Sequence, residues 1–318
     1  MRLVFCGTPQ FAIPTLEALI AAGHDIPLVV TQPDRPQGRG LALAASPVKQ
    51  SAQKHGLRID QPEKIKNNAE FRSLLEEIAA EAIIVVGYGR IIPSWMLALP
   101  KHGNINLHAS LLPKYRGAAP IQWAIAEGET VSGVTTIILN EGLDTGDVLL
   151  LRELAIDPDD TAITYGQRLA TIGADLMVET LRGLEPGSIT PRPQDHSQAT
   201  LAPILKREDG QADFGLPAQR ICNRLRGFQP WPGCFTSFRQ KKLNIAIAKP
   251  IQIDGHYAAG ELIVDRDRLF VACNNSALEL LEVQPEGKRK MSARDFIRGY
   301  RPMKGEKLGP ESEVKGSR

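Results

Sequence analysis

Ala82-Ile83-Ile84-Val85-Val86 is a run of five apolar residues that decides how the first part of the chain folds. Such a run suits a strand that is buried on both faces, as at the centre of a parallel sheet. Further strand-like runs occur at residues 3–6, 26–31, 105–108 and 134–139. Between them, apolar residues recur at helical spacing, as in segments 71–78 and 165–176. This alternation predicts an α/β fold with a doubly wound, mostly parallel sheet over residues 1–190.

The composition changes after this region. Glu185-Pro186-Gly187 and Pro191-Arg192-Pro193 interrupt the helical pattern and predict a linker, which we place at residues 191–205. Short β-prone runs then follow one another closely, at residues 235–238, 243–248, 260–264, 269–272 and 278–283. Strands of this length and spacing predict a small barrel or sandwich over residues 206–318.

The composition also excludes several classes of protein. With 42% hydrophobic and 23% charged residues, the chain is an ordinary globular one, and no apolar run is long enough to cross a membrane. The N-terminus has neither a signal-peptide nor a transit-peptide pattern. The four cysteines match no zinc spacing, so reduced thiols and a cytoplasmic location are expected. Only Gly7 of a G-x-G-x-x-G pattern follows the first predicted strand, which argues against a dinucleotide site.

Charge is distributed unevenly along the chain. Residues 1–205 carry 17 Lys and Arg against 22 Asp and Glu, whereas residues 206–318 carry 21 against 14. The basic C-terminal part indicates a polyanionic partner, although ordinary variation in surface charge also explains the difference. The densest basic runs, Lys241-Lys242 and Lys288-Arg289-Lys290, are the candidate contacts to such a partner.

Asn106 and His108 are two residues apart in a predicted strand, so their side chains share one face. Ligands of open α/β sheets bind beyond the carboxyl ends of strands, where this pair would lie. A histidine there can hold or pass a proton, and an asparagine can donate a hydrogen bond to a developing oxyanion. The alternative is a structural histidine with a capping asparagine.

Asp144 follows the predicted strand at residues 134–139, in a loop that contains Gly142 and Gly146. The glycines allow the loop to bring the carboxylate to a neighbouring strand end, where it would orient His108 and favour the imidazolium form. The alternative is a turn aspartate that bonds its own backbone.

Three further loops are candidates for ligand binding. Residues 110–117 and 87–90 follow predicted strands, and the glycines of the second loop would let a flat ring approach the backbone. The alternative for both loops is a simple turn, and periodicity does not distinguish the two. Residues 33–40 form a long polar loop whose Arg35 and Arg39 suit contact with phosphate, unless the loop is a disordered insertion.

Ordered motifs extend across nearly the whole chain: Gly7-Thr8-Pro9, Gln32-Pro33-Asp34-Arg35-Pro36, Asn106-Leu107-His108-Ala109-Ser110-Leu111-Leu112-Pro113, Tyr115-Arg116-Gly117-Ala118-Ala119-Pro120, Leu143-Asp144-Thr145-Gly146 and Arg226-Gly227-Phe228-Gln229-Pro230-Trp231-Pro232-Gly233. Together they resemble the methionyl-tRNA formyltransferase family. The Asn-x-His and Asp set is shared by the folate-dependent formyltransferases of this superfamily, so it indicates the chemistry and not the acceptor. The 33–40 loop and the 226–233 motif are more specific to the tRNA enzymes.

The resemblance implies a Rossmann-like formyltransferase domain followed by an OB-like β-barrel that binds tRNA. It implies transfer of a formyl group from 10-formyltetrahydrofolate to the α-amino group of methionyl initiator tRNA, without a metal, and we expect a monomer. By motif, the catalytic residues are Asn106, His108 and Asp144. The folate-binding residues are Ser110, Leu111, Leu112 and Pro113, with Val86, Tyr88, Gly89 and Arg90 at the wall of the pterin pocket. The tRNA-binding residues are Arg35, Arg39, Lys241, Lys242, Lys288, Arg289 and Lys290.

Two segments depart from the family pattern. Leu41-Ala42-Leu43-Ala44-Ala45 stands where basic residues are usual, so Arg39 would carry more of the phosphate contact. Gly87 and Arg90 alter the expected pterin pocket. Two other functions stay open: another formyl-folate enzyme that acts on a small amine or on water, and a non-catalytic RNA-binding protein. The latter predicts a broken Asn-His-Asp set, whereas the set here is intact.

Overall fold

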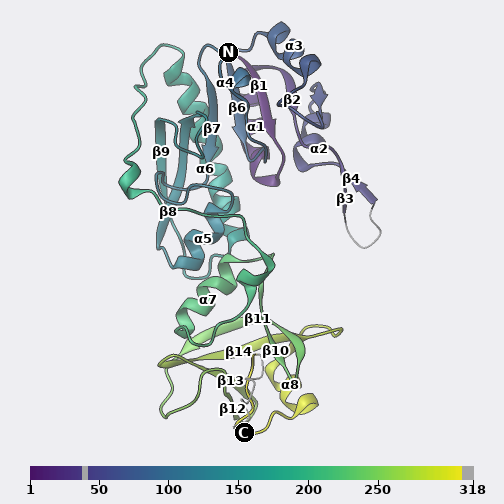
Figure 1. Cartoon of the computed structure of the whole chain (residues 1–318), viewed down its shortest axis with the longest axis vertical. Coiled ribbons are helices and arrows are strands. Elements are labelled where there is room, and N and C mark those ends of the chain that lie inside the picture. Colours follow the sequence, from purple (N-terminus) through teal and green to yellow (C-terminus); the bar gives the residue numbers. More distant parts are fainter. Residues whose placement is uncertain (38–41, 310–318) are drawn as a thin grey trace, which may run out of the picture. The chain divides into compact units, whose positions relative to one another are not determined.

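The computed structural model describes residues 1–37 and 42–309, and Figure 1 shows its ribbon. The chain forms two compact units. Unit 1 comprises residues 1–120, 131–155 and 164–203, and unit 2 comprises residues 121–130, 156–163 and 204–318. Two segments that come before residue 164 thus belong to unit 2. The division into residues 1–190, 191–205 and 206–318 stays a prediction.

A seven-stranded sheet forms the centre of unit 1, in the order β5-β2-β1-β6-β7-β8-β9. The strands are β1 (Arg2–Gly7), β2 (Asp25–Val30), β5 (Ile59–Asp60), β6 (Ala82–Val86), β7 (Asn104–His108), β8 (Val131–Ile138) and β9 (Val148–Ala155). The strands from β5 to β7 are parallel to their neighbours, whereas β8 is antiparallel to both β7 and β9. The doubly wound, mostly parallel sheet expected from the sequence is confirmed.

Helices lie around this sheet, and some of them begin after a residue whose side chain caps the first turn. They are α1 (Ile13–Ala21), α2 (Pro47–Lys54), α3 (Ala69–Ile78), α4 (Ser94–Leu97) and α6 (Ala162–Leu184), with short 3-10 turns η1 (Gln10–Ala12) and η2 (His196–Gln198). Before α2, the Ser46 hydroxyl accepts the Lys49 N–H at 3.1 Å, which satisfies one of the unpaired donors of the first turn. Apolar residues of α3 then pack against β1, β2 and β6 in one core cluster.

The sheet has a topological switch point between β1 and β6, because β1 is followed outward by β2 and β5, and β6 by β7. Gly7 ends β1 opposite Val86, the last residue of β6. A Cβ at Gly7 would lie 3.1 Å from the Val86 carbonyl oxygen and 2.8 Å from the Phe5 ring, so glycine is required there. Ligands of open α/β sheets bind beyond the carboxyl ends of the strands at such a point.

The long polar segment after β2 is a two-stranded ribbon rather than the loop expected from the sequence. β3 (Arg35–Gln37) pairs antiparallel with β4 (Ala42–Ala44). Asp34 anchors its base by accepting hydrogen bonds from Lys49 at 2.6 Å and from Gln61 at 2.8 Å. Arg39, the expected tRNA contact, lies outside the described residues. The polar composition of this segment led to the expectation of a loop, because it does not indicate the backbone pairing of β3 with β4.

Unit 2 is mostly antiparallel β structure, as the sequence predicts. Its strands are β10 (Cys234–Phe238), β11 (Lys241–Ile251), β12 (Leu262–Asp265), β13 (Arg268–Cys273), β14 (Ser276–Pro285) and β15 (Met291–Ser292), and its helical segments include α5 (Pro120–Glu127), η3 (Arg207–Gly210), α7 (Ala218–Gly227) and α8 (Ala293–Tyr300). The strand order is β10-β11-β14-β13-β12, with β15 on β14. Inward residues such as Leu243 and Ile245 pack with Phe296 of α8 in one core.

The 226–233 motif joins α7 to the two early segments of unit 2. Arg226 donates to the Asp160 carbonyl at 2.7 Å. A Cβ at Gly227 would lie 2.6 Å from the Gln122 carbonyl oxygen, so glycine permits α7 to approach α5 closely. Phe228 is fully buried and meets Trp123 edge to face, with ring centroids 5.3 Å apart. The motif therefore has an internal structural role in unit 2.

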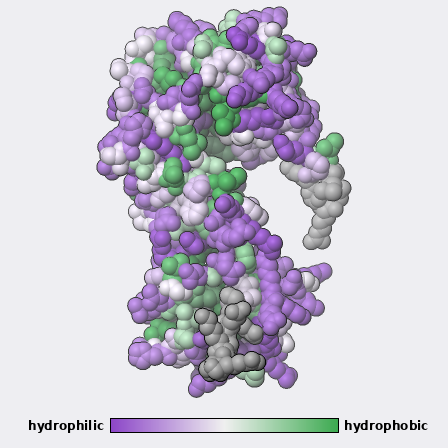
Figure 2. Space-filling model, viewed as in Figure 1, coloured by the Kyte–Doolittle hydropathy of each residue, from purple (hydrophilic) through white to green (hydrophobic). Residues whose placement is uncertain are grey.

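The face that Figure 2 shows is mostly hydrophilic, with separate hydrophobic areas. Within residues 1–37 and 42–309, no helix is both long enough and apolar enough to cross a membrane.

Candidate active site

Strand β7 presents three polar side chains on one face, because residues two apart point the same way. Asn104 donates to the Met96 carbonyl at 2.9 Å and is therefore structural. Asn106 is buried, yet its amide forms no hydrogen bond within the described part of the chain. Leu107 points to the other face, where Gly173 of α6 leaves room for it. The open amide of Asn106 is thus available to a ligand.

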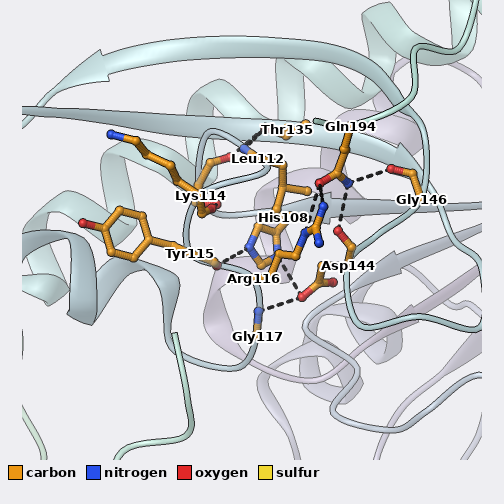
Figure 3. A network of polar contacts seen from close by, with 11 residues as sticks. His108, Leu112, Lys114, Tyr115, Arg116, Gly117, Thr135, Asp144, Gly146 and Gln194 are labelled. Atoms are coloured by element: carbon orange, nitrogen blue, oxygen red, sulfur yellow. Dashed lines mark hydrogen bonds and ion pairs between the residues drawn. The ribbon is translucent and has the colours of Figure 1, made fainter. Parts of the chain in front are cut away.

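His108 ends β7 and is only 6% exposed. Its Nε2 donates to the Tyr115 carbonyl at 2.9 Å, so that nitrogen carries a proton. Nδ1 faces the Asp144 carboxylate at 3.7 Å, a distance for an ion pair rather than a direct hydrogen bond. Figure 3 shows the ring between these two oxygens. The Tyr115 carbonyl, rather than Asp144, therefore sets the tautomer of the neutral ring.

Asp144 reaches His108 by a loop that runs back along β7. β8 ends at Ile138, opposite Ile105, which is three residues before His108. Asp144 itself has a left-handed backbone with φ of 50°, which is unfavourable for a residue with a side chain. Its carboxylate accepts the Gly117 N–H at 2.9 Å. The structure thus brings together two side chains that the sequence placed on separate elements.

Two residues without an assigned role hold this loop. Arg116 is 7% exposed and donates to the Gln194 amide oxygen through Nε at 3.1 Å and Nη2 at 2.6 Å. The amide nitrogen of Gln194 donates to the carbonyls of Asp144 at 2.8 Å and Gly146 at 2.7 Å, as Figure 3 shows. Sequence reasoning missed Gln194, because it lies in the Pro-rich segment interpreted as a linker.

The predicted folate-binding segment 110–113 is fixed by internal hydrogen bonds. The Ser110 hydroxyl donates to the Lys114 carbonyl at 2.6 Å, and Thr135 of β8 donates to the Ser110 carbonyl at 2.7 Å. Leu112 packs on β8 and β9, while Leu111 and Pro113 are partly exposed. The side chains open to a ligand here are therefore Leu111 and Pro113.

The segment 86–90 lies at the carboxyl end of β6. Val86 is buried, and the Tyr88 ring lies in the core at 1% exposure, where burial raises the pKa of its hydroxyl well above the usual range. The Tyr88 carbonyl accepts hydrogen bonds from Gln32 at 3.1 Å and from the Thr8 hydroxyl at 3.2 Å. Arg90 donates to the Glu63 carbonyl at 2.6 Å. Tyr88 thus faces the interior, and only the backbone and neighbours of this segment remain for a ligand.

The two predicted basic runs of unit 2 are brought together by the pairing of β11 with β14. β11 begins at Lys241, and its Leu243 lies opposite Pro285 at the end of β14. The Glu286 N–H donates to the Lys242 carbonyl at 2.9 Å, just before residues 288–290. The two runs therefore occupy one end of this strand pair. In unit 1, the predicted tRNA contact Arg35 is exposed on β3.

The remaining chemically reactive groups are buried or dispersed. Cys6 is a buried free thiol of β1, and burial raises its pKa, so it is a core residue as expected. Cys222, Cys234 and Cys273 are also free and lie in the core of unit 2. Among residues 1–37 and 42–309, no three His, Cys, Asp or Glu side chains are arranged to hold a metal ion.

Comparisons with known proteins cover both units. The family model described as formyl transferase matches residues 1–181, and the model described as formyl transferase, C-terminal domain, matches residues 204–301. The methionyl-tRNA formyltransferase of Koribacter versatilis is 61% identical over 310 residues, which cover 97% of this chain and 99% of that protein. The enzyme of the same name from Acidobacterium capsulatum is 60% identical over 300 residues, covering 94% and 96%.

A solved structure has the same fold at low sequence identity. The N-formyltransferase of Helicobacter canadensis, in complex with folinic acid and dTDP-3-aminofucose, superposes with a TM-score of 0.65 at 16% identity. The match covers 90% of this chain and 99% of that one. The likeness supports an α/β domain followed by a mostly antiparallel β domain.

Proposed function

The chain belongs to the methionyl-tRNA formyltransferases, and from this membership we propose which of its residues perform the reaction. The enzyme transfers a formyl group from 10-formyltetrahydrofolate to the amino group of methionyl-tRNA. One observation carries the assignment of roles. Asn106 shares a face of β7 with His108, whose ring faces the Asp144 carboxylate at 3.7 Å.

The chemistry is acyl transfer, and it balances without a covalent enzyme intermediate. The neutral amine attacks the formyl carbon, a carbon–nitrogen bond forms, and the carbonyl oxygen becomes an oxyanion. The amine nitrogen then loses one proton. The oxyanion collapses, the bond from the formyl carbon to N10 of the folate breaks, and N10 takes up one proton. The products are N-formylmethionyl-tRNA and tetrahydrofolate.

Asn106 and His108 are proposed to stabilise the oxyanion. The Asn106 amide has hydrogen-bond donors that the described residues leave free. The Nε2–H of His108 is committed to the Tyr115 carbonyl, so Nδ1 is the nitrogen that gains or loses a proton. Protonated at Nδ1, the ring is an imidazolium that faces the site and the Asp144 carboxylate.

The folate is proposed to lie between segments 110–113 and 86–90, the segments that follow β7 and β6. Since Ser110 and Leu112 are used internally, the direct contacts come from the backbone, Leu111 and Pro113. Gly89 and Arg90 form the opposite wall, and the Arg90 guanidinium is held by the Glu63 carbonyl. Val86 and Tyr88 support that wall from the core.

The tRNA is proposed to bind unit 2 through Lys241, Lys242, Lys288, Arg289 and Lys290. Lys288 and Arg289 are exposed and have no ion-pair partner within residues 1–37 and 42–309. Such side chains suit phosphate, which requires charge more than a fixed geometry. Arg35 of β3 and Arg39 are proposed as the contacts to the acceptor arm.

The proposed acceptor is specifically the initiator tRNA, and the enzyme is proposed to act in the cytoplasm as a monomer. A formyl-transfer assay with charged initiator tRNA beside charged elongator tRNA tests the acceptor. Faster transfer to the initiator is expected. Equal rates for the two tRNAs would exclude initiator selection, and transfer to free methionine or water alone would favour the small-acceptor alternative.

A further inference from the structure

Arg116 is a buried cation whose contacts within the described chain include no carboxylate. Besides Gln194, its Nη2 contacts Nδ1 of His196 at 3.0 Å. Removing a guanidinium from water is costly, and neutral partners offset only part of that cost. The buried position of Arg116 in the 115–120 motif is therefore not explained by folding stability alone.

The amide of Gln194 can adopt only one orientation. A guanidinium has donors and no acceptor, so the atom facing Arg116 must be the amide oxygen. The amide nitrogen must then face the carbonyls of Asp144 and Gly146, and it donates to both. Arg116 thus fixes the orientation of the Gln194 amide, and this amide in turn holds the backbone carbonyl of Asp144.

Asp144 needs such support. Aspartate tolerates a left-handed backbone better than most residues with a side chain, but this conformation still costs free energy that contacts with neighbours offset. Gln194 holds its carbonyl, and Gly117 holds its carboxylate at 2.9 Å. A Cβ at Gly117 would lie 2.7 Å from the Ala202 carbonyl oxygen. The residue that donates to the Asp144 carboxylate must therefore be a glycine.

The segment that carries Gln194 is fixed to both catalytic loops by its backbone. The Arg116 N–H donates to the Thr200 carbonyl at 2.9 Å, and the Ala202 N–H donates to the Arg116 carbonyl at 2.7 Å. Nearer its start, Arg192 pairs with Val148 of β9. Residues 192–202 therefore form a strap across the two loops, and the backbone hydrogen bonds of the strap fix the position of Gln194.

We propose that Arg116 and Gln194 are positioning residues for the formyl transfer, which hold Asp144 where its carboxylate faces His108. The proposal rests on the roles proposed above for His108 and Asp144. Neither residue needs to touch the substrates, so removing either side chain should reduce kcat and leave both KM values nearly unchanged.

Gln194→Met provides the first test, because methionine keeps the length of the side chain and removes both hydrogen-bonding groups. We expect kcat to fall about 10–100-fold, the scale for a displaced catalytic group, with both KM values within about 2-fold of wild type. The amide proton of Gly117 should move upfield in NMR spectra of glycine-labelled protein, since its carboxylate acceptor moves away. Gln198→Met is the matched control, because Gln198 is exposed on the same strap.

A second variant separates positioning from stability. Gln194→Met leaves the Arg116 guanidinium buried without its main partner, so this protein should be less stable. In Arg116→Met/Gln194→Met the buried charge is removed as well, and stability should recover. A merely structural role predicts that kcat recovers with it, whereas positioning predicts that kcat stays low and the Gly117 signal stays shifted.

Asp144→Asn, measured beside these variants, distinguishes failure of the positioning proposal from failure of the proposed function. Recovery of kcat in the double variant, or a Gly117 signal at its wild-type place, overturns the positioning role. If Asp144→Asn is inactive while Gln194→Met is normal, only the positioning role fails. If Asp144→Asn is as active as the wild type, the proposed role of Asp144 fails and the positioning role fails with it.

Discussion

Polar groups at strand ends are arranged in opposite ways in the two units. In unit 1 they lie at the end of β7 and in the loop after β8, where defined partners hold them: Tyr115 holds the buried His108, and Gly117 holds the partly exposed Asp144. After β14 of unit 2, Lys288 and Arg289 are exposed and without ion-pair partners among the described residues. The contrast matches two physical tasks: reaction at one carbonyl needs fixed positions, whereas binding a polyanion needs charge density.

The largest effect should come from the held groups of unit 1. His108→Ala and Asp144→Ala are each expected to lower kcat by at least ~10²-fold, the scale for a proton-transfer or oxyanion group. The fold should be retained, because these side chains bury little apolar area. Steady-state formyl transfer measures the effect, circular dichroism checks the fold, and the exposed His55→Ala is the control. Normal turnover in a folded variant would show that the substituted residue is not catalytic, and the contrast between the two units would then not hold.

Phe228 should show that the 226–233 motif of unit 2 acts on stability rather than on the chemical step. Phe228→Ala is expected to cost about 3–5 kcal/mol of unfolding free energy, because the ring is fully buried against Trp123. Denaturant unfolding measures this decrease. Trp231→Ala in the same motif is the control, since this ring is 54% exposed and its removal should change stability by less than about 0.5 kcal/mol. Equal decreases in both variants would contradict the internal role of the motif.

Some features of the site in unit 1 could be predicted from the sequence, because they depend on residues that are close together in the chain. Asn106 and His108 share a face because strands repeat every two residues. Gly142 and Gly146 indicated that the Asp144 loop could fold back, and a Cβ at Gly146 would indeed lie 1.7 Å from the Ile138 carbonyl oxygen. Local spacing was sufficient for both inferences.

The rest depends on contacts between residues far apart in the chain. Gln194 binds the Asp144 carbonyl across 50 positions, and no local pattern marks it. Likewise, α5 belongs to unit 2 because Gly227 lets α7 approach it. Tyr88 was expected at a pocket wall, yet its ring turns into the core between Gly87 and Gly89, which have φ of 56° and 76°. Such backbone turns follow from tertiary packing.

Glu279 tests whether a buried charge of unit 2 is held like those of unit 1. It accepts hydrogen bonds from Arg268 at 2.8 and 3.0 Å, which, with Lys249, keep its pKa below the usual range despite burial. A depressed folded-state pKa stabilises the protein above the unfolded pKa of about 4.3, and this stabilisation disappears as the pH falls through the folded value. Glu279→Gln should therefore melt below the wild type at pH 7, with a difference that shrinks below about pH 4. A difference independent of pH would contradict the pairing.

The smallest effect should come from the exposed basic run. Lys288→Ala/Arg289→Ala is expected to raise the KM for methionyl-tRNA, initiator and elongator alike, and to leave the KM for formyl-folate unchanged. The salt dependence of tRNA binding should flatten by up to roughly 0.7–0.9 log units for each bond to phosphate that the substitutions remove. Lys290→Ala is the graded control, because Glu282 lies 3.6 Å from its ammonium group and already offsets part of its charge. An unchanged salt slope in the double variant would exclude this run from the tRNA surface, and charge density in unit 2 would then have to act through Lys241 and Lys242.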